Sequence, residues 1–175
     1  MAKNHVEHMS RELHIVGFKV GRETYGVPIT SLHEIVRVPE ITAVPDAPDY
    51  LEGVINLRGK IVSVMDLRKR FGEKETTLRR QNRILVVEHG GRLAGLIVDS
   101  ASEVLKIPAD AVEAPPAVFQ DGGLNCVTGL GKVDGRLVVL LDMSKLLAPE
   151  SLQVKSEPGE KKTVPKAEAR AAAAK

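Results

Sequence analysis

The sequence predicts an all-β fold with short helices, arranged as two similar β-barrel subdomains that are related by pseudo-symmetry around a shared apolar core. Three observations support this fold class. The 175-residue chain is rich in Val, Ile and Leu but has no Trp and only 3% aromatic residues, which favours aliphatic strands. Glycine and proline divide the apolar stretches into short segments. The two halves of the chain also repeat one pattern of residues.

The first half of the chain aligns with the second half without gaps in two places. Residues 26–36 lie over residues 95–105, and residues 53–67 lie over residues 129–143. The repeated units are too few for a solenoid, so two subdomains that share one plan are the simplest interpretation. The coinciding pairs are Gly26/Gly95, Ser31/Ser100, Glu34/Glu103, Gly53/Gly129, Gly59/Gly135, Lys60/Arg136 and Asp66/Asp142.

Each half is predicted to begin with two strands that are joined by a glycine turn. The first pair comprises residues 13–20 and 27–29, and the second pair comprises residues 84–87 and 96–98.

A short helical segment is predicted after each strand pair. Ser31 and Glu34 have the S-x-x-E spacing of a capping box, and so do Ser100 and Glu103. In such a box the Ser side chain accepts a hydrogen bond from a free backbone N–H, and the Glu side chain reaches back.

Proline-rich segments follow at residues 39–48 and 108–116, where loops or edge segments are expected. Each leads to the most apolar strand of its half, at residues 61–65 and 137–141. Because these strands are apolar at consecutive positions, we expect both of their faces to be buried, as where two barrels press together.

Asp66 and Asp142 end these strands, where each carboxylate can cap a short helix. The helices are predicted at residues 67–71 and 143–147. The sequence then offers about five short strands per half, which is a number suited to a barrel, because closure removes exposed sheet edges.

Three regions are predicted along the chain. Residues 12–150 form the domain, and within it the repeats cover roughly residues 16–80 and 81–148 as interleaved subdomains. Residues 1–11 form a flexible leader, and residues 151–175 form a disordered tail rich in Lys, Glu, Ala and Pro.

The positive charge of the protein lies mostly in the tail. Residues 155–175 contain six Lys or Arg and three Glu, so the rest of the chain carries 19 positive and 20 negative charges. A neutral folded part with few aromatic residues argues against nucleic-acid binding. No apolar run approaches the roughly 20 residues that span a bilayer, so direct membrane insertion is not expected. We expect a cytoplasmic protein.

The sequence predicts no catalytic, cofactor or metal site. His5 and His8 lie in the polar leader, and the single cysteine, Cys126, has no nearby His and is expected to be a small buried residue. Residues 129–134 narrowly miss the G-x-G-x-x-G pattern and precede a strand rather than a helix. Protein binding remains as the expected activity.

The segment Gly-Val-Ile-Asn-Leu-Arg-Gly at residues 53–59, followed by Ile-Val-Ser-Val-Met-Asp-Leu-Arg at residues 61–68, resembles the signature of the CheW family. The resemblance covers about residues 12–148. Supporting segments occur in the order of the family, at residues 25–29, 34–36, 44–48, 95–99, 127–131 and 146–147.

The resemblance implies a fold of two SH3-like five-stranded barrels with an apolar seam between them. It also implies a non-enzymatic chemotaxis coupling protein with two partners, the regulatory domain of the histidine kinase CheA and the cytoplasmic tip of methyl-accepting chemoreceptors. Other CheW copies could join it in rings. Such a protein would be cytoplasmic and recruited to membrane-associated receptor arrays.

The resemblance places interface residues at and near the signature turn. Arg58 is the most specific of them, because its repeat counterpart is Asp134, so the repeat does not need an arginine for folding. An internal pair with Glu34 or plain exposure would also explain Arg58, and the capping box would explain Glu34. The interface residues are Arg58, Glu34, Ile35, Leu32, Asn56, Leu57, Gly53 and Gly59.

The receptor groove is expected along the short aliphatic strands that the repeat places in equivalent positions. For each of these side chains a place in the core is the competing interpretation. The groove residues are Val27, Ile29, Leu96 and Val98.

Three other functions stay open at this stage. The chain could be a coupler for a non-flagellar chemosensory pathway, or an unrelated peptide-binding double SH3-like barrel. An enzyme is the third choice, and it would use Asp66, Asp99 or Cys126.

Overall fold

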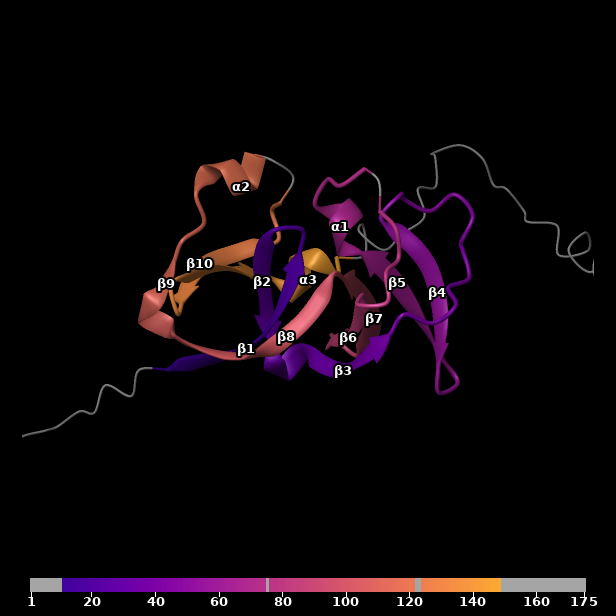
Figure 1. Cartoon of the computed structure of the whole chain (residues 1–175), viewed down its shortest axis with the longest axis horizontal. Coiled ribbons are helices and arrows are strands. Elements are labelled where there is room, and N and C mark those ends of the chain that lie inside the picture. Colours follow the sequence, from indigo (N-terminus) through magenta and orange to yellow (C-terminus); the bar gives the residue numbers. More distant parts are fainter. Residues whose placement is uncertain (1–10, 75, 122–123, 149–175) are drawn as a thin grey trace, which may run out of the picture.

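The structure is a computed structural model that describes residues 11–74, 76–121 and 124–148. It is an all-β protein with two sheets and a few short helices, as the sequence predicts (Figure 1). The predicted tail and all but the last residue of the predicted leader lie outside the described residues.

One sheet combines strands from both ends of the chain, and we call it the terminal barrel. Its spatial order is β8-β1-β2-β11-β10-β9. The strands are β1 (Glu12–Val20), β2 (Glu23–Pro28), β8 (Ser100–Pro108), β9 (Val112–Glu113), β10 (Val127–Val133) and β11 (Arg136–Leu141).

The other sheet is formed by the middle of the chain, and we call it the central barrel. Its spatial order is β3-β6-β7-β5-β4. The strands are β3 (Leu32–Arg37), β4 (Leu51–Leu57), β5 (Lys60–Asp66), β6 (Arg83–His89) and β7 (Arg92–Val98).

The helices are one or two turns long. The α-helices are α1 (Leu67–Arg70), α2 (Ala117–Asp121) and α3 (Met143–Leu146), and the 3-10 helices are η1 (Ile29–Ser31) and η2 (Ala109–Ala111). All but α3, which follows β11, connect strands. No helix within the described ranges is long and apolar enough to cross a membrane.

The two barrels share one plan but do not correspond to the two sequence repeats. The repeat pairs β1 with β6, β2 with β7, β3 with β8, β4 with β10 and β5 with β11, and each member of a pair lies in a different barrel. Each barrel therefore takes strands from both halves of the chain. In each barrel one parallel and one antiparallel pair join the two halves. These pairs are β2–β11 and β1–β8 in the terminal barrel, and β5–β7 and β3–β6 in the central barrel.

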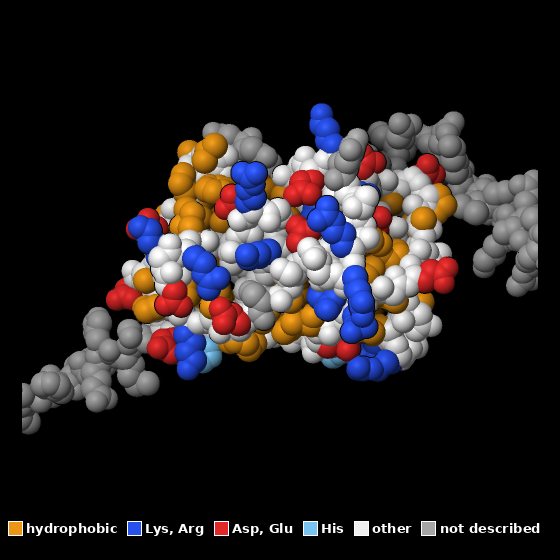
Figure 2. All heavy atoms as spheres, viewed as in Figure 1, with side chains coloured by type: hydrophobic (Ala, Val, Ile, Leu, Met, Phe, Trp, Pro, Cys, Tyr) orange, Lys and Arg blue, Asp and Glu red, His pale blue; other side chains and the backbone are white. Residues whose placement is uncertain are grey.

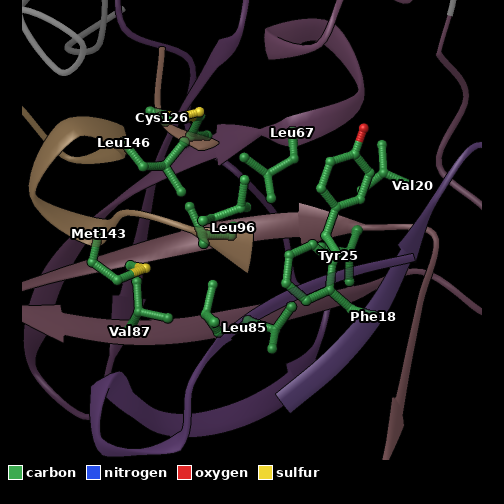
Figure 3. Packing of buried hydrophobic residues seen from close by; sticks show 14 of the residues in the cluster. Phe18, Val20, Tyr25, Leu67, Leu85, Val87, Leu96, Cys126, Met143 and Leu146 are labelled. Carbon is green, nitrogen blue, oxygen red and sulfur yellow. The ribbon is translucent and has the colours of Figure 1, made fainter. Parts of the chain in front are cut away.

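The consecutive apolar residues are explained by burial on both faces of a strand. Along β6, Ile84 and Val86 fill the inside of the central barrel, whereas Leu85 and Val87 belong to a core that both barrels share. Figure 3 shows Phe18, Leu85 and Leu96 from different strands in that shared core. The predicted shared apolar core is confirmed, and it makes the two barrels one packing unit.

The predicted helical segments at the two capping boxes are wrong. Leu32–Arg37 and Ser100–Pro108 are strands, and neither Ser31 nor Ser100 begins an α-helix. Side chains along β3 alternate between half-buried and exposed, which is the period of a strand. Pairing of these segments with β6 and β1 satisfies the backbone groups that a helix would have satisfied internally.

The predicted aspartate caps are confirmed. Asp66 accepts a hydrogen bond from the backbone N–H of Arg68 at 2.9 Å, and Asp142 accepts one from that of Ser144 at 2.8 Å. Each aspartate thus satisfies a free N–H at the start of a one-turn helix. Both helices end one residue earlier than predicted.

Asp66 also anchors a buried polar network. The guanidinium of Arg68 donates from Nε and Nη2 to the two carboxylate oxygens at 3.0 and 2.8 Å, and both side chains are almost fully buried. Nη1 of Arg68 donates to the carbonyl of Thr77 at 2.9 Å and lies 3.7 Å from Asp99. The network ties α1 to the segment that leads into β6.

Candidate protein-binding surfaces

The predicted residues Arg58 and Glu34 meet at one end of the central barrel. Arg58 lies in the tight turn between β4 and β5, and its Nη2 donates to Oε2 of Glu34 on β3 at 3.0 Å. The Arg58 side chain is 76% exposed, whereas that of Glu34 is 18% exposed. Oε1 of Glu34 is buried and accepts no hydrogen bond; Nε2 of His33 lies 3.9 Å away.

The backbone of the turn does not favour an arginine. Arg58 and Gly59 have φ values of 51° and 82°, and the side chain of Asn56 accepts a hydrogen bond from the N–H of Gly59 at 2.9 Å. Turns with two left-handed residues prefer Asn-Gly or Asp-Gly, and the terminal barrel has Asp134-Gly135 at this place. The turn therefore gives no reason for the arginine, whose side chain extends into solvent.

The terminal barrel carries a related ion pair that was not predicted. Nη2 of Arg136 lies 3.3 Å from Oε1 of Glu103, the repeat counterpart of Glu34. Arg136 aligns with Lys60 rather than with Arg58, so the arginine has moved two positions across the turn. The matching glutamates Glu34 and Glu103 could have indicated this second ion pair, but the sequence analysis interpreted them as parts of helix-capping boxes.

Exposed aliphatic side chains accompany each ion pair. Ile35 and Ile61 of the central barrel are exposed, and their repeat counterparts Val104 and Leu137 of the terminal barrel are exposed too. Ile35 was predicted as an interface residue, whereas the other three were missed. The sequence did hold a signal for these three residues. Each is an aliphatic residue at an outward-facing strand position, and the other repeat has an aliphatic residue at the matching position.

Other predicted interface residues have internal roles. Leu32 packs against the shared core, and Leu57 packs against the interior of the central barrel. Gly53, at a φ of 146°, lies directly beneath the carbonyl of Thr42, which bridges to Val54. The absence of a side chain at Gly53 therefore allows the close approach of a segment of the same chain.

The predicted groove residues do not line an open groove. Val27, Leu96 and Val98 have no exposed surface, and Ile29 is half-buried against the same shared core. For the first three the groove prediction is wrong and the competing core interpretation holds. Because both barrels contribute strands to the shared core, equivalent positions of the repeat meet inside it.

An open pocket of about 420 Å³, here called the hollow, lies between the terminal barrel and the end of β6. It is mainly apolar, with two histidines and the Asp142 cap among its polar groups. Sequence reasoning missed it, because its walls come from segments far apart in the chain. Its lining residues are Leu13, His14, Ile15, Gly26, Pro28, Ser31, His89, Thr128, Leu140, Leu141, Asp142, Met143 and Ser144.

Burial and hydrogen bonding shift the pKa values of several titratable groups. Burial raises the pKa of the Cys126 thiol and raises the pKa of Tyr25 to about 12, so both groups are neutral near pH 7. The hydrogen bond from the Ser144 side chain lowers the pKa of Asp142, whose carboxylate serves as a helix cap. Within the described residues no three His, Cys, Asp or Glu side chains are placed to hold a metal ion.

Comparison with known proteins gives one consistent result. The family model for the "CheW-like domain" matches residues 14–151 of this chain. The chemotaxis protein CheW of Helicobacter pylori is 36% identical over 135 residues, which cover 77% of this chain and 81% of the relative. The chemotaxis protein CheW of Klebsiella aerogenes is 33% identical over the same shares. The crystal structure of the scaffolding protein TtCheW from Thermoanaerobacter tengcongensis is 38% identical, has a TM-score of 0.74, and is matched over 81% of this chain and 96% of that chain.

Proposed function

The chain belongs to the CheW-like domain family, and from this premise we propose that it bridges the regulatory domain of the histidine kinase CheA to the cytoplasmic tip of methyl-accepting chemoreceptors. Its similar relatives are named chemotaxis and scaffolding proteins, which supports a non-catalytic role. The protein acts through binding energy alone: the state of the receptor changes kinase activity through contacts that differ between the two states.

Arg58 is the observation that carries this proposal. Its position is left-handed, which an arginine does not favour, and its side chain is exposed beside the buried free oxygen of Glu34. Residues kept against local preference mark functional sites. The exposed Ile35 and Ile61 add apolar area in the same barrel. This combination of an arginine with aliphatic side chains suits a protein partner, and we assign it to the kinase.

The receptor contact is assigned to the hollow beside β6. It is mainly apolar and is lined by β1, β2, β11 and the start of α3. A helix of the receptor tip could lay its apolar face into such a hollow, which is a common mode of peptide recognition. This assignment replaces the groove that the sequence alone suggested.

The related surface of the terminal barrel offers a place for a second partner. It repeats the glutamate–arginine pair and two exposed aliphatic side chains. A CheW-like kinase domain or another copy of this protein could dock there, so that barrels alternate in a ring. Many weak contacts of this kind would act together in a receptor array.

The proposal is tested by measuring CheA autophosphorylation in receptor-containing membranes. We expect the wild type to raise the receptor-dependent autophosphorylation of CheA. With the Arg58→Glu variant, we expect this kinase activity to stay close to that measured without added protein. The reversed charge would face Glu34 and remove the guanidinium from the interface. Arg22→Glu, at an exposed turn of the terminal barrel, makes the same change in charge and should behave as the wild type.

A double variant separates the internal pair from the interface. Glu34→Arg with Arg58→Glu restores an ion pair within the barrel but presents the opposite charges to the partner. We expect it to remain inactive in coupling. Recovery of full coupling would show that only the internal pair matters. If the wild type itself neither changes kinase activity nor binds to kinase and membranes, the proposed function is wrong for that partner pair.

A further inference from the structure

Four arginines gather where β3 ends and β6 begins. Arg37 is the last residue of β3 and Arg83 is the first residue of β6, while Arg79 and Arg80 lie in the turn before β6. Figure 2 shows Lys and Arg side chains in blue gathered on the face that carries β3 and the start of β6. We call these four residues the arginine patch.

The patch is not neutralised by the protein itself. None of the four guanidinium groups forms an ion pair with a carboxylate in the part of the chain that the structure describes. Arg37 and Arg83 are moreover directly opposite each other on neighbouring antiparallel strands. Like charges in such pairs are destabilising. The fold therefore holds positive charges together at a cost.

The turn that carries the patch is held by a buried residue. Asn82 is 1% exposed, and its side chain accepts a hydrogen bond from the N–H of Arg79 and donates one to the carbonyl of Asp99 at 3.2 Å. The guanidinium of Arg83 donates to the carbonyls of Arg80 and Asn82 at 2.9 and 2.8 Å. The backbone of the turn and the guanidinium of Arg83 are thus held in place before a partner binds, which lowers the entropy cost of binding.

The other barrel shows that the patch is not required by the fold. The repeat counterparts of Arg83 and Arg37 are His14 and Lys106, which are likewise directly opposite each other. There Glu12 lies 3.6 Å from His14 and supplies a negative charge. The counterpart of Glu12 in the central barrel is Gln81. The terminal barrel thus has a carboxylate beside its His–Lys pair, whereas the central barrel has a neutral glutamine at the equivalent position beside two arginines.

Exposed aliphatic residues border the patch and indicate the kind of partner. Leu78 precedes Arg79, and Ile35 lies two positions before Arg37 on the same exposed side of β3; both are exposed. A phosphate ion or a nucleic-acid backbone has no apolar group to bury against them. A protein segment with carboxylates and apolar side chains would pair with both features.

We infer that the arginine patch is a docking surface for an acidic, amphipathic segment of a partner protein. Forked guanidinium groups bind carboxylates in a fixed geometry, and four of them on one face favour a segment with several Asp or Glu residues. This surface is additional to the three contacts proposed above, although it borders the one assigned to the kinase at Ile35, and it can be tested without kinase or receptor.

The test measures fluorescence polarisation of a fluorescein-labelled amphipathic peptide of Glu and Leu. We expect saturable binding that weakens with added salt. Replacing the four arginines of the patch with glutamine should weaken binding about tenfold or more. The matched control replaces four exposed Lys or Arg residues outside the patch with glutamine. This control changes the net charge by the same amount and should have little effect on peptide binding. The control residues are Lys19, Arg22, Arg92 and Lys132.

Two further probes decide between classes of partner. The same peptide with Gln in place of Glu should bind weakly, because the charge of the carboxylates is lost. Labelled oligothymidylate should bind more weakly than the Glu and Leu peptide. Tighter, patch-dependent binding of the oligonucleotide would overturn the inference, as would the absence of saturable peptide binding or equal losses in the patch and control variants.

Discussion

Arg58 occupies a backbone position that its residue type does not favour. Its left-handed conformation suits Asn or Asp, and the other barrel has Asp134 there. Its ion pair with Glu34 is mostly solvent-exposed on the arginine side, so it adds little to stability. The side chain is therefore expected to matter more for binding than for folding.

Replacing Arg58 with Asn should separate these two roles. We expect the free energy of unfolding to be unchanged or to rise by up to about 1 kcal/mol, because Asn fits the turn better. Coupling of kinase to receptor should be lost. Urea denaturation and the autophosphorylation assay measure the two effects. A fall in stability of more than about 1 kcal/mol would instead make the Glu34–Arg58 pair a structural element.

Gly53 and Gly59 should respond differently to alanine. At Gly53 a Cβ atom would collide with the carbonyl of Thr42, whereas at Gly59 it would meet open space; both residues have positive φ. We expect Gly53→Ala to lower the free energy of unfolding by about 3 kcal/mol and Gly59→Ala by about 1 kcal/mol. If urea denaturation shows that both variants lose the same free energy of unfolding, the positive φ alone, and not the packed Thr42 segment, determines the destabilisation.

At the scale of secondary-structure elements, the two aspartate-capped helices offer an internal comparison. Asp66 is buried and is held by Arg68 through two further hydrogen bonds, whereas Asp142 is half-buried and has Ser144 in the place of Arg68. The same repeat position therefore carries a buried ion pair in one helix and a simple cap in the other.

Alanine substitutions should reveal this difference. Asp66→Ala leaves the buried guanidinium of Arg68 without its carboxylate and should cost about 3–5 kcal/mol. Asp142→Ala removes a cap and should cost about 1 kcal/mol. Thermal or urea unfolding of both variants provides the comparison. If Asp142→Ala proves as costly as Asp66→Ala, the buried pair is not what stabilises α1.

The Asp142 cap also predicts a pH dependence. The pKa of Asp142 is lowered in the folded state by its hydrogen bond with Ser144. Its contribution is therefore fully present above the unfolded pKa of about 4 and is lost as the pH falls through the lower folded pKa. The stability difference between wild type and Asp142→Asn should be constant near neutral pH and shrink below about pH 4. A difference that grows on acidification would contradict this account.

The elements also show what local sequence can predict. The aspartate caps and the strands that they follow were predicted correctly, because an apolar run followed by Asp is a local signal. The strand predicted at residues 27–29 instead runs from Glu23 to Pro28. The segments at Ser31 and Ser100 were mistaken for helices, since the S-x-x-E pattern is compatible with a strand when β6 and β1 offer edges to pair with. Arg58 could be singled out from the mismatch between repeats, but Arg136 could not, because its contact with Glu103 spans 33 positions.

At the scale of the whole molecule, the duplication is visible in the sequence and interleaved subdomains were expected, but the sequence does not show which strands are exchanged. Each half alone would lack strands of both barrels, because each barrel pairs strands of one half with strands of the other. Which strands pair across the halves depends on packing in the shared core, and no local pattern records that choice. For the same reason the groove was assigned to residues that turn out to be core.

The interleaved topology predicts the behaviour of fragments. Residues 1–80 and 81–175, produced separately, should show little cooperative structure, because each would expose its share of the common core. Mixed in equal amounts, they should recover the far-ultraviolet circular dichroism of the intact protein. A cooperatively folded single half would contradict the described topology.

The bridge itself is the central claim, and sedimentation of kinase with receptor tests it most directly. Vesicles that carry chemoreceptors are pelleted with the isolated regulatory domain of CheA, with and without this protein. We predict that the domain pellets only when the protein is present, and that Arg58→Glu abolishes its recovery while leaving the variant itself bound to the vesicles. Equal recovery of the domain with and without the protein, or none in either case, would contradict a bridge between these two partners.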